Sequence, residues 1–239
     1  MRNTDLERIK KLENNIGYVY KDKNKALQAI IHSSYAYEHR HEGLGSNERL
    51  EFLGDSVLNF LITNKLFKEV SDMPEGEMSK LRASVVSEAS LSHCARLLNI
   101  GDVLLLGKGE EIMGGRKRPS ILADAVEAII GSVYLDGGLE AAEEFVNRFL
   151  NENYEKAING TLFRDYKTKL QEEVQKGSNC NIKYSVIEEK GPDHDKVFTV
   201  AVYVNGEQMG QGTGKTKKEA EQKAAGDALT RIKAEALEL

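Results

Sequence analysis

A long segment without any basic residue places the strongest constraint on how this chain can fold. From residue 119 to residue 147 the sequence contains no Lys or Arg. Pro119 and Ser120 open a run in which apolar residues cover nearly the whole circumference of a helix, the pattern of a helix buried on all sides. Its apolar members are Ile121, Leu122, Ala125, Val126, Ile129, Ile130 and Val133. We therefore predict a helical core built around this segment.

Two carboxylates interrupt this apolar helix. Asp124 and Glu127 are three residues apart, which places them on one face. A buried carboxylate must be neutralised, pair with a distant Lys or Arg, or bind a metal ion. The sequence leaves these alternatives open. Ala128 and Gly131 lie close by, and residues this small would let a second helix approach closely.

A second acidic stretch lies nearer the start of the chain. At about 100° per residue, its carboxylates Glu48, Glu51 and Asp55 fall within an arc of about 60° on a helix. An amphipathic helix with a solvated acidic face is one interpretation. Ile62 on the same arc, with Phe52 beside it, indicates instead a face that is not simply turned to water. The buried stripe predicted for the opposite side consists of Leu50, Leu53, Val57, Phe60 and Leu61.

Bringing the two acidic faces together would create a pocket that only bound cations make tolerable. Mg²⁺ prefers oxygen ligands and is usually held by a few carboxylates together with substrate phosphate. The His and Cys residues do not have the spacing of a zinc site. Residues 212–216 lack the first glycine of a Walker loop, so we exclude an NTPase. The nucleophile motif G-x-S-x-G is not present either. The sequence thus predicts a metal-dependent centre that cleaves phosphodiester bonds.

Length, cysteine use and charge limit the class of protein. A chain of 239 residues suggests one or two domains. We expect no leader and no membrane span, because no run approaches roughly 18 apolar residues. Cys94 and Cys180 lie in different predicted domains, which favours a reducing cytoplasm. Residues 161–239 hold 13 basic and 13 acidic residues, so the first part carries the whole net charge of −5, and RNA is not excluded as a partner.

The sequence pattern changes near residues 151–163, a polar stretch that contains helix-breaking Asn and Gly residues. Helical periodicity dominates before it. After it we predict a helix over 165–176, strands over 182–186 and 198–204, a third strand that leads to Gly214, and a final helix. Asn205-Gly206 is a strong signal for a hairpin turn between the last two strands.

The final helix begins with an unusual charge pattern. Thr216 and Glu219 predict a capping box, in which Thr216 accepts from the Glu219 amide and the Glu219 side chain returns the bond. Lys217 and Lys218 occupy the first turn, where the helix macrodipole disfavours cations. A local rule broken in this way often marks function, and lysines beside helix N–H groups suit a phosphate. A solvated lysine pair is the alternative.

Four motifs resemble the ribonuclease III family and occur in the family's order. They are residues 47–58 (NERLEFLGDSVL), 106–110 (LGKGE), 116–124 (RKRPSILAD) and 134–138 (YLDGG). One departure is Ile31, where the family commonly has Thr before the following His. The basic loop 116–118 is open to two interpretations, a phosphate contact or a solvated loop.

The resemblance implies roles for several acidic residues. The metal-binding and catalytic carboxylates would be Glu51, Asp55, Asp124 and Glu127. Glu48 and Glu75 match secondary acidic positions near the same cleft. Phe52 matches a residue that packs into the partner subunit of a homodimer, with a place in the intrachain core as the alternative.

Residues 212–225 resemble the double-stranded-RNA-binding domain, as do the predicted α-β-β-β-α order and the loop at Gly191-Pro192. This resemblance implies RNA contacts from three elements. Lysines at the start of the last helix would contact phosphates across the major groove, the loop would reach one minor groove, and the first helix would reach the other. The lysines are Lys215, Lys217 and Lys218, and the loop residue is His194. The residues of the first helix are Thr168, Gln171 and Glu172. Glu221 stands where many such domains have a basic residue, so we expect modest affinity.

The resemblances together predict a two-domain protein. An all-α ribonuclease III catalytic and dimerisation domain (1–150) is followed by a linker (151–163) and a small α+β double-stranded-RNA-binding domain (164–233). The implied activity is Mg²⁺-dependent hydrolysis of double-stranded RNA, with Mn²⁺ able to substitute, leaving 5′-phosphates and short 3′ overhangs. Ribosomal RNA precursors and other structured transcripts are the implied substrates. The alternatives are an RNA-binding regulator whose first domain only dimerises, and a hydrolase of small phosphate esters.

Overall fold

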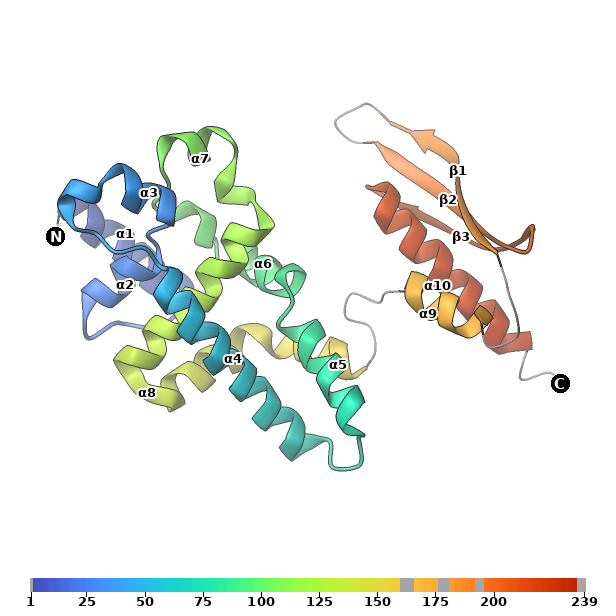
Figure 1. The fold of residues 1–239 in the computed structure, drawn as a ribbon, viewed down its shortest axis with the longest axis horizontal. Helices are drawn as coiled ribbons and strands as arrows, with labels where there is room; N and C mark the ends of the chain where they lie inside the picture. Colours follow the sequence, from blue (N-terminus) through green and yellow to red (C-terminus); the bar gives the residue numbers. More distant parts are fainter. Residues whose placement is uncertain (1, 160–165, 176–180, 192–195, 236–239) are drawn as a thin grey trace. The chain divides into compact units, whose positions relative to one another are not determined.

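The computed structural model describes residues 2–159, 166–175, 181–191 and 196–235. The chain divides into two compact units, Met1–Leu162 and Phe163–Leu239 (Figure 1). The first unit is helical, and the second combines three strands with two helices. The predicted fold class, an all-α domain followed by a small α+β domain, is confirmed.

The first unit is a bundle of helices connected by short turns, in which η denotes a 3₁₀ turn. In chain order these are α1 (Asn3–Ile16), α2 (Lys23–Ala29), α3 (Ser33–Glu38), η1 (Arg40–Glu42), α4 (Glu48–Glu69), α5 (Glu75–Val85), α6 (Glu88–Leu97), η2 (Ile100–Asp102), α7 (Lys108–Ile112), η3 (Gly115–Lys117) and α8 (Pro119–Ile158). Helix α8 packs against α2, α4, α5 and α6, and all seven apolar residues predicted to be buried in it are buried. The basic-free segment is therefore the centre of the core, as predicted.

Helices α4 and α8 approach each other at two glycines. A methyl group on Gly54 would overlap the carbonyl oxygen of Glu127, and one on Gly131 would overlap the carbonyl oxygen of Leu50. The backbones are therefore in contact, without a layer of side chains between them. This confirms the close approach expected from the small residue at position 131.

The buried side of α4 is rotated relative to the prediction. Leu50, Val57 and Leu61 are buried as expected, but the prediction is wrong for Phe60, which is 53% exposed. Ile62 is buried, which confirms that the carboxylate arc is not simply turned to water. The cause is the crossing of α8, which contacts α4 at Gly54, between the predicted stripe and the carboxylates, and leaves the side with Phe60 exposed.

Helix α8 continues into the stretch that was expected to be a linker. Residues 151–158 are helical, and Tyr154 is buried. The side chain of Asn153, a residue expected to break the helix, donates to Ser90 Oγ over 2.8 Å, and the side-chain Oδ1 of Asn151 accepts from Lys65 Nζ over 2.6 Å. These tertiary hydrogen bonds hold polar side chains inside a helix, so the helical unit extends further than the local composition indicates.

The second unit consists of α9 (Tyr166–Gln175), β1 (Ile182–Lys190), β2 (Val197–Val204), β3 (Glu207–Gly214) and α10 (Lys217–Glu235). The strands form an antiparallel sheet in the order β1-β2-β3. The predicted hairpin turn is present, with φ of 53° at Asn205 and 89° at Gly206. Strand β1 runs four residues further than predicted, past an irregularity in its pairing with β2 between Val186 and Glu188.

Alanines of α10 pack closely against β3. Ala224 and Ala228 lie so near Gly210 that a methyl group there would overlap their backbone. The small core also contains Leu170 of α9 and Val200 of β2. No helix in the described ranges is both long enough and apolar enough to cross a membrane.

The α4–α8 crossing predicts the effect of a single methyl group. Gly131→Ala should destabilise the first unit by about 1–3 kcal/mol, because the two backbones must move apart. Gly76→Ala in α5 is the control, since its methyl group would meet no atom within 4 Å and Ala favours a helix by about 1 kcal/mol over Gly. Urea unfolding followed by far-UV circular dichroism measures both. Equal stability of Gly131→Ala and the wild type would contradict the backbone contact.

Candidate metal and active site

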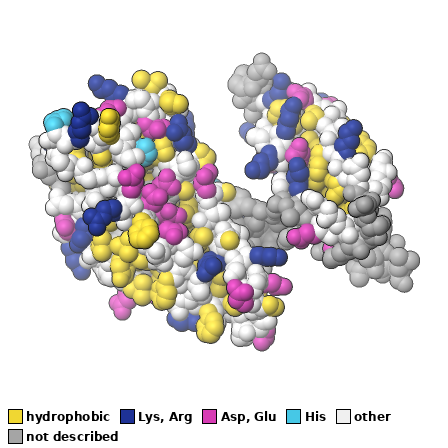
Figure 2. All heavy atoms as spheres, viewed as in Figure 1, with side chains coloured by type: hydrophobic (Ala, Val, Ile, Leu, Met, Phe, Trp, Pro, Cys, Tyr) yellow, Lys and Arg dark blue, Asp and Glu magenta, His cyan; other side chains and the backbone are white. Residues whose placement is uncertain are grey.

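Three carboxylates from α4 and α8 meet beside the glycine crossing. Glu51, Asp124 and Glu127 each place one carboxylate oxygen within 4.8 Å of the others. The three side chains are half-buried. Figure 2 shows acidic side chains gathered on one face of the helical unit, next to a hydrophobic area. The structure thus brings the two predicted acidic faces together.

Burial and neighbouring negative charges raise the pKa values of the three clustered carboxylates. Burial raises the pKa of Glu127 to about 7, and the charges of Asp55, Asp124 and Glu51 add to this effect. Burial is also the main cause of the raised pKa of Glu51 and of Asp124. The group therefore holds fewer negative charges at neutral pH than its composition indicates, unless a cation is bound.

The surroundings of the cluster argue against a distant Lys or Arg partner, one of the three alternatives that the sequence left open. Among the described residues, no Lys or Arg contributes to the pKa shift of Asp124 or Glu127. His32 lowers the pKa of Asp124, and Glu88 raises it. An oxygen-only donor set without a Lys or Arg partner suits a hard divalent cation.

Asp55 lies one turn beyond Glu51 on α4 and outside the group of three. Its side chain is exposed, and its Oδ1 accepts from Asn59 Nδ2 over 2.8 Å. Its charge nevertheless reaches both Glu127 and Glu51, whose pKa values it raises. Glu48 is also exposed and accepts from Ser46 Oγ over 2.9 Å. Both residues border the cluster.

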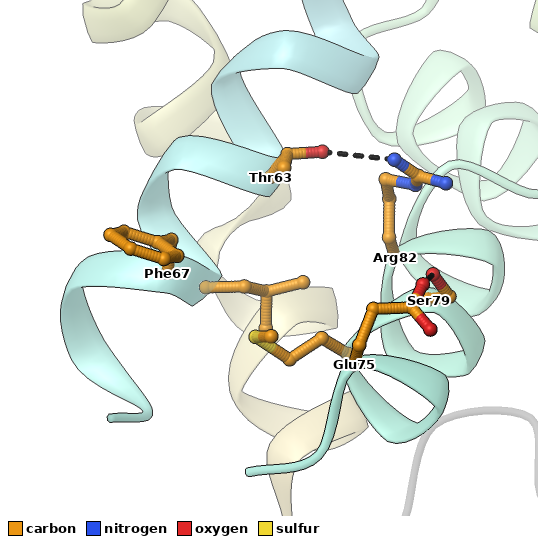
Figure 3. A pocket seen from close by; sticks show the side chains of 7 residues that line it. Thr63, Phe67, Glu75, Ser79 and Arg82 are labelled. Atoms are coloured by element: carbon orange, nitrogen blue, oxygen red, sulfur yellow. Dashed lines mark hydrogen bonds between the residues drawn. The ribbon is translucent and has the colours of Figure 1, made fainter. Parts of the chain in front are cut away.

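Glu75 is not brought to this cluster within one chain. It begins α5, and its Oε1 accepts from Ser79 Oγ over 2.7 Å. It lines a separate pocket between α4 and α5 (Figure 3). The residues around this pocket are Thr63, Leu66, Phe67, Glu75, Met78, Ser79 and Arg82. Phe52 does not belong to the intrachain core, because it is 78% exposed.

Three neighbours of the acidic residues were not predicted from the sequence, namely His32, Glu88 and Asn59. His32 caps the start of α3, and Glu88 lies in the first turn of α6. Each reaches Asp124 only through the packing of separate helices, so no sequence spacing could have indicated it. Asn59 follows Asp55 by four residues, and that i, i+4 spacing on one helix was the available signal.

The basic loop before α8 is largely engaged in structural contacts. Arg116 donates to the carbonyl oxygens of Gly101 and Leu104, both over 2.8 Å. Arg118 pairs with Glu110 at 2.6 Å. Lys117 is exposed. Two of the three cations thus anchor the chain beside α8.

The start of α10 differs in one detail from the predicted capping box. Thr216 Oγ1 accepts from the Glu219 N–H over 3.1 Å, as expected. The Glu219 carboxylate, however, accepts from the N–H of Lys215 over 2.9 Å, one residue before the expected donor. Lys217 and Lys218 are exposed in the first turn, and the lysines of residues 215–218 therefore gather around a capped helix start.

The remaining RNA-contact candidates lie on α9 and in a loop. Gln171 and Glu172 are exposed on α9. The side chain of Thr168 and the whole of His194 lie outside the described residues. Glu221, expected to weaken RNA binding, pairs with Lys167 of α9 at 2.7 Å. Its charge is therefore partly compensated within the unit.

Comparison with known proteins assigns both units. Residues 22–154 match the Ribonuclease-III-like family, and residues 166–232 match the Double-stranded RNA binding motif. A ribonuclease 3 of Caldanaerobacter subterraneus subsp. tengcongensis is 50% identical over 92% of this chain and 96% of the relative. A ribonuclease 3 of Pelotomaculum thermopropionicum is 48% identical over 93% of this chain and 92% of the relative. The solved nuclease domain of ribonuclease III from Campylobacter jejuni has 42% identity and a TM-score of 0.57, and covers 62% of this chain and 99% of that domain.

A helical unit with a half-buried carboxylate cluster, followed by an RNA-binding motif, is the architecture of a metal-dependent nuclease. The chain belongs to the ribonuclease III family.

The raised pKa of Glu127 predicts how pH acts on the metal-free protein. Its folded-state value of about 7 exceeds the ordinary 4.5, so its contribution to stability is present at acidic pH and is lost as the pH rises through about 7. Between about pH 5 and pH 8, in chelator, this contribution should fall by an amount on the order of 1 kcal/mol, after allowing for solvent screening of a half-buried group. Glu127→Gln should flatten the profile, whereas Glu143→Gln, at an exposed position of α8, should not. Thermal unfolding at a series of pH values measures the stability of the three proteins. Parallel plots of stability against pH would contradict the raised pKa of Glu127.

Proposed function

We propose that this chain is a Mg²⁺-dependent endoribonuclease that hydrolyses phosphodiester bonds of double-stranded RNA. The supporting observation is the cluster of Glu51, Asp124 and Glu127 in a chain that also carries a double-stranded-RNA-binding motif. The products would carry 5′-phosphates and short 3′ overhangs, and Mn²⁺ would substitute for Mg²⁺. Ribosomal RNA precursors and other structured transcripts are the proposed substrates.

The carboxylates would have different roles at the site. Glu51 and Asp124 would fix the position of the cation, while Glu127 and Asp55 would matter most for the reaction. When bound, a divalent cation supplies an acidified water molecule and a positive charge beside the attacked phosphate. The raised pKa of Glu127 means that part of its population gives up a proton when a cation binds. Glu48, next to the cluster, would add negative charge at its edge.

The second unit would hold the RNA duplex by its shape. Lys217 and Lys218, with Lys215 beside them, would contact phosphates across the major groove. Gln171 and Glu172 on α9, with Thr168, would reach one minor groove, and His194 would reach another. Readout of A-form shape and 2′-hydroxyls implies little sequence preference.

The exposed aromatic side chains of α4 support a homodimer. Phe52 and Phe67 are 78% and 74% exposed, and Phe67 lines the pocket between α4 and α5 (Figure 3). In a two-fold dimer a contact from one end of α4 to the other end of the partner's α4 occurs twice. Phe52 of one copy would enter the pocket of the other. Because Phe52 follows Glu51, this would bring Glu75 of the partner subunit toward the carboxylate cluster.

A cytoplasmic location is part of the proposal. Cys94 is buried and forms no disulfide, and burial raises the pKa of its thiol to about 12. Such a thiol behaves as an unreactive core side chain. Cys180 lies outside the described residues.

Cleavage assays test the proposed activity. Long double-stranded RNA, matched single-stranded RNA and double-stranded DNA are incubated with wild type or Glu127→Gln, in Mg²⁺ or chelator. Only double-stranded RNA with metal should be cut, and Glu127→Gln should lower the rate by about 100-fold or more while it still binds the duplex. A wild type that binds and never cuts would support an RNA-binding regulator instead. Cleavage of small phosphate esters alone would support the other alternative.

The dimer proposal has its own test. Phe52→Asp should raise the dissociation constant of the homodimer by about 30-fold or more, because a charge would have to enter an apolar pocket. Ile112→Asp is the control, at a side chain on α7 that is 86% exposed and outside the proposed interface. Sedimentation equilibrium measures both. Equal dissociation constants for the two variants would show that Phe52 is not an interface residue.

A further inference from the structure

Lys217, the first residue of α10, is engaged by two other side chains of the second unit. Its Nζ lies 3.2 Å from Oε1 of Glu189 on β1 and 5.4 Å from the ring centroid of Phe198 on β2. Glu189 and Phe198 are directly paired across the two strands, so their side chains share one face of the sheet. Three elements therefore contribute one side chain each to a row that ends at the start of α10.

Glu189 is an anion placed at a cationic surface. Its Oε2 also lies 3.5 Å from Nζ of Lys196. Its pKa is lowered, chiefly by the hydrogen bond from Lys217. The side chains of Lys217 and Glu189 are 57% and 37% exposed, so water and RNA can reach the pair. The carboxylate thus offers Lys217 the same kind of partner, an oxygen anion, that an RNA phosphate would offer.

The carboxylate and a phosphate cannot both use Lys217 without cost. Two anions that approach one ammonium group repel each other across it, and the repulsion is strongest at low ionic strength. Resting on the proposed binding of double-stranded RNA, we infer that Glu189 is an intramolecular competitor for Lys217 that limits the affinity of the second unit for RNA phosphates.

Salt dependence distinguishes this competition from simple loss of charge. The affinity of a protein for a nucleic acid falls with salt in proportion to the number of phosphates that its cations neutralise. While Glu189 neutralises the charge of Lys217, that lysine adds little to the number of neutralised phosphates. Removal of the carboxylate makes the charge of Lys217 available to an RNA phosphate.

The test measures binding of double-stranded RNA by the full chain in chelator, by fluorescence anisotropy over a series of KCl concentrations. Glu189→Gln should bind about two- to fivefold more tightly at low salt. Its plot of log affinity against log salt should be steeper by about one. In a Lys217→Gln background the gain from the same substitution should be clearly smaller, because the competed lysine is absent and only Lys196 remains beside Glu189.

Glu188→Gln is the matched control. It removes the same charge from the adjacent position of β1, but within the described ranges Glu188 pairs with Lys190 at 2.7 Å and with no side chain of α10. Equal gains from Glu188→Gln and Glu189→Gln would overturn the inference, since net charge alone would explain them. Weaker binding by Glu189→Gln would also overturn it, because Glu189 would then orient Lys217 for RNA. Failure of the wild type to bind double-stranded RNA would reject the proposed function, and this inference with it.

Discussion

The contact between the backbones of α4 and α8 is the constraint on which the first unit depends. Gly54 and Gly131 remove the side chains that normally keep packed helices about 8–10 Å apart. As a result, short carboxylate side chains from two helices reach one another without bending either backbone. A larger residue at either position would separate Glu51 from Glu127 and open the acidic pocket to water. The geometry of the site is therefore set by two residues that have no chemistry of their own.

The same crossing creates the electrostatic repulsion between the carboxylates of the site. Like charges are held together by the apolar core that α4 and α8 share, which includes Leu58 and Ile62 on α4 and Ile129 and Ile130 on α8. The core supplies stability that does not depend on pH, whereas the carboxylates withdraw part of it as they ionise. A cation bound only by the folded chain would recover that loss by mass action. Metal binding at the cluster would thus be coupled to folding of the first unit through Glu127.

The parts predicted from the sequence are those that depend on local periodicity. Helical spacing placed Asp124 and Glu127 on one face, and the turn at Asn205-Gly206 followed from backbone preferences alone. The errors arise where tertiary contacts override local rules. Phe60 is exposed because α8 covers another side of α4, and Asn153 stays helical because Ser90 accepts its hydrogen bond. Glu75 lies away from the cluster in one chain, which no spacing along the sequence could reveal.

The second unit balances its cations locally, and this bears on how a nuclease turns over. Glu221 pairs with Lys167, and Glu189 pairs with Lys217, so acidic side chains accompany the cations near the start of α10. Phosphate contacts are individually weak and strongly salt-dependent, and their sum sets how long a duplex stays bound. An enzyme that must release cut duplex gains nothing from binding product as tightly as substrate. If carboxylates such as Glu189 compete with RNA phosphates for these lysines, they shorten the bound lifetime without altering the carboxylate cluster, so affinity and chemistry would be adjusted separately in the two units.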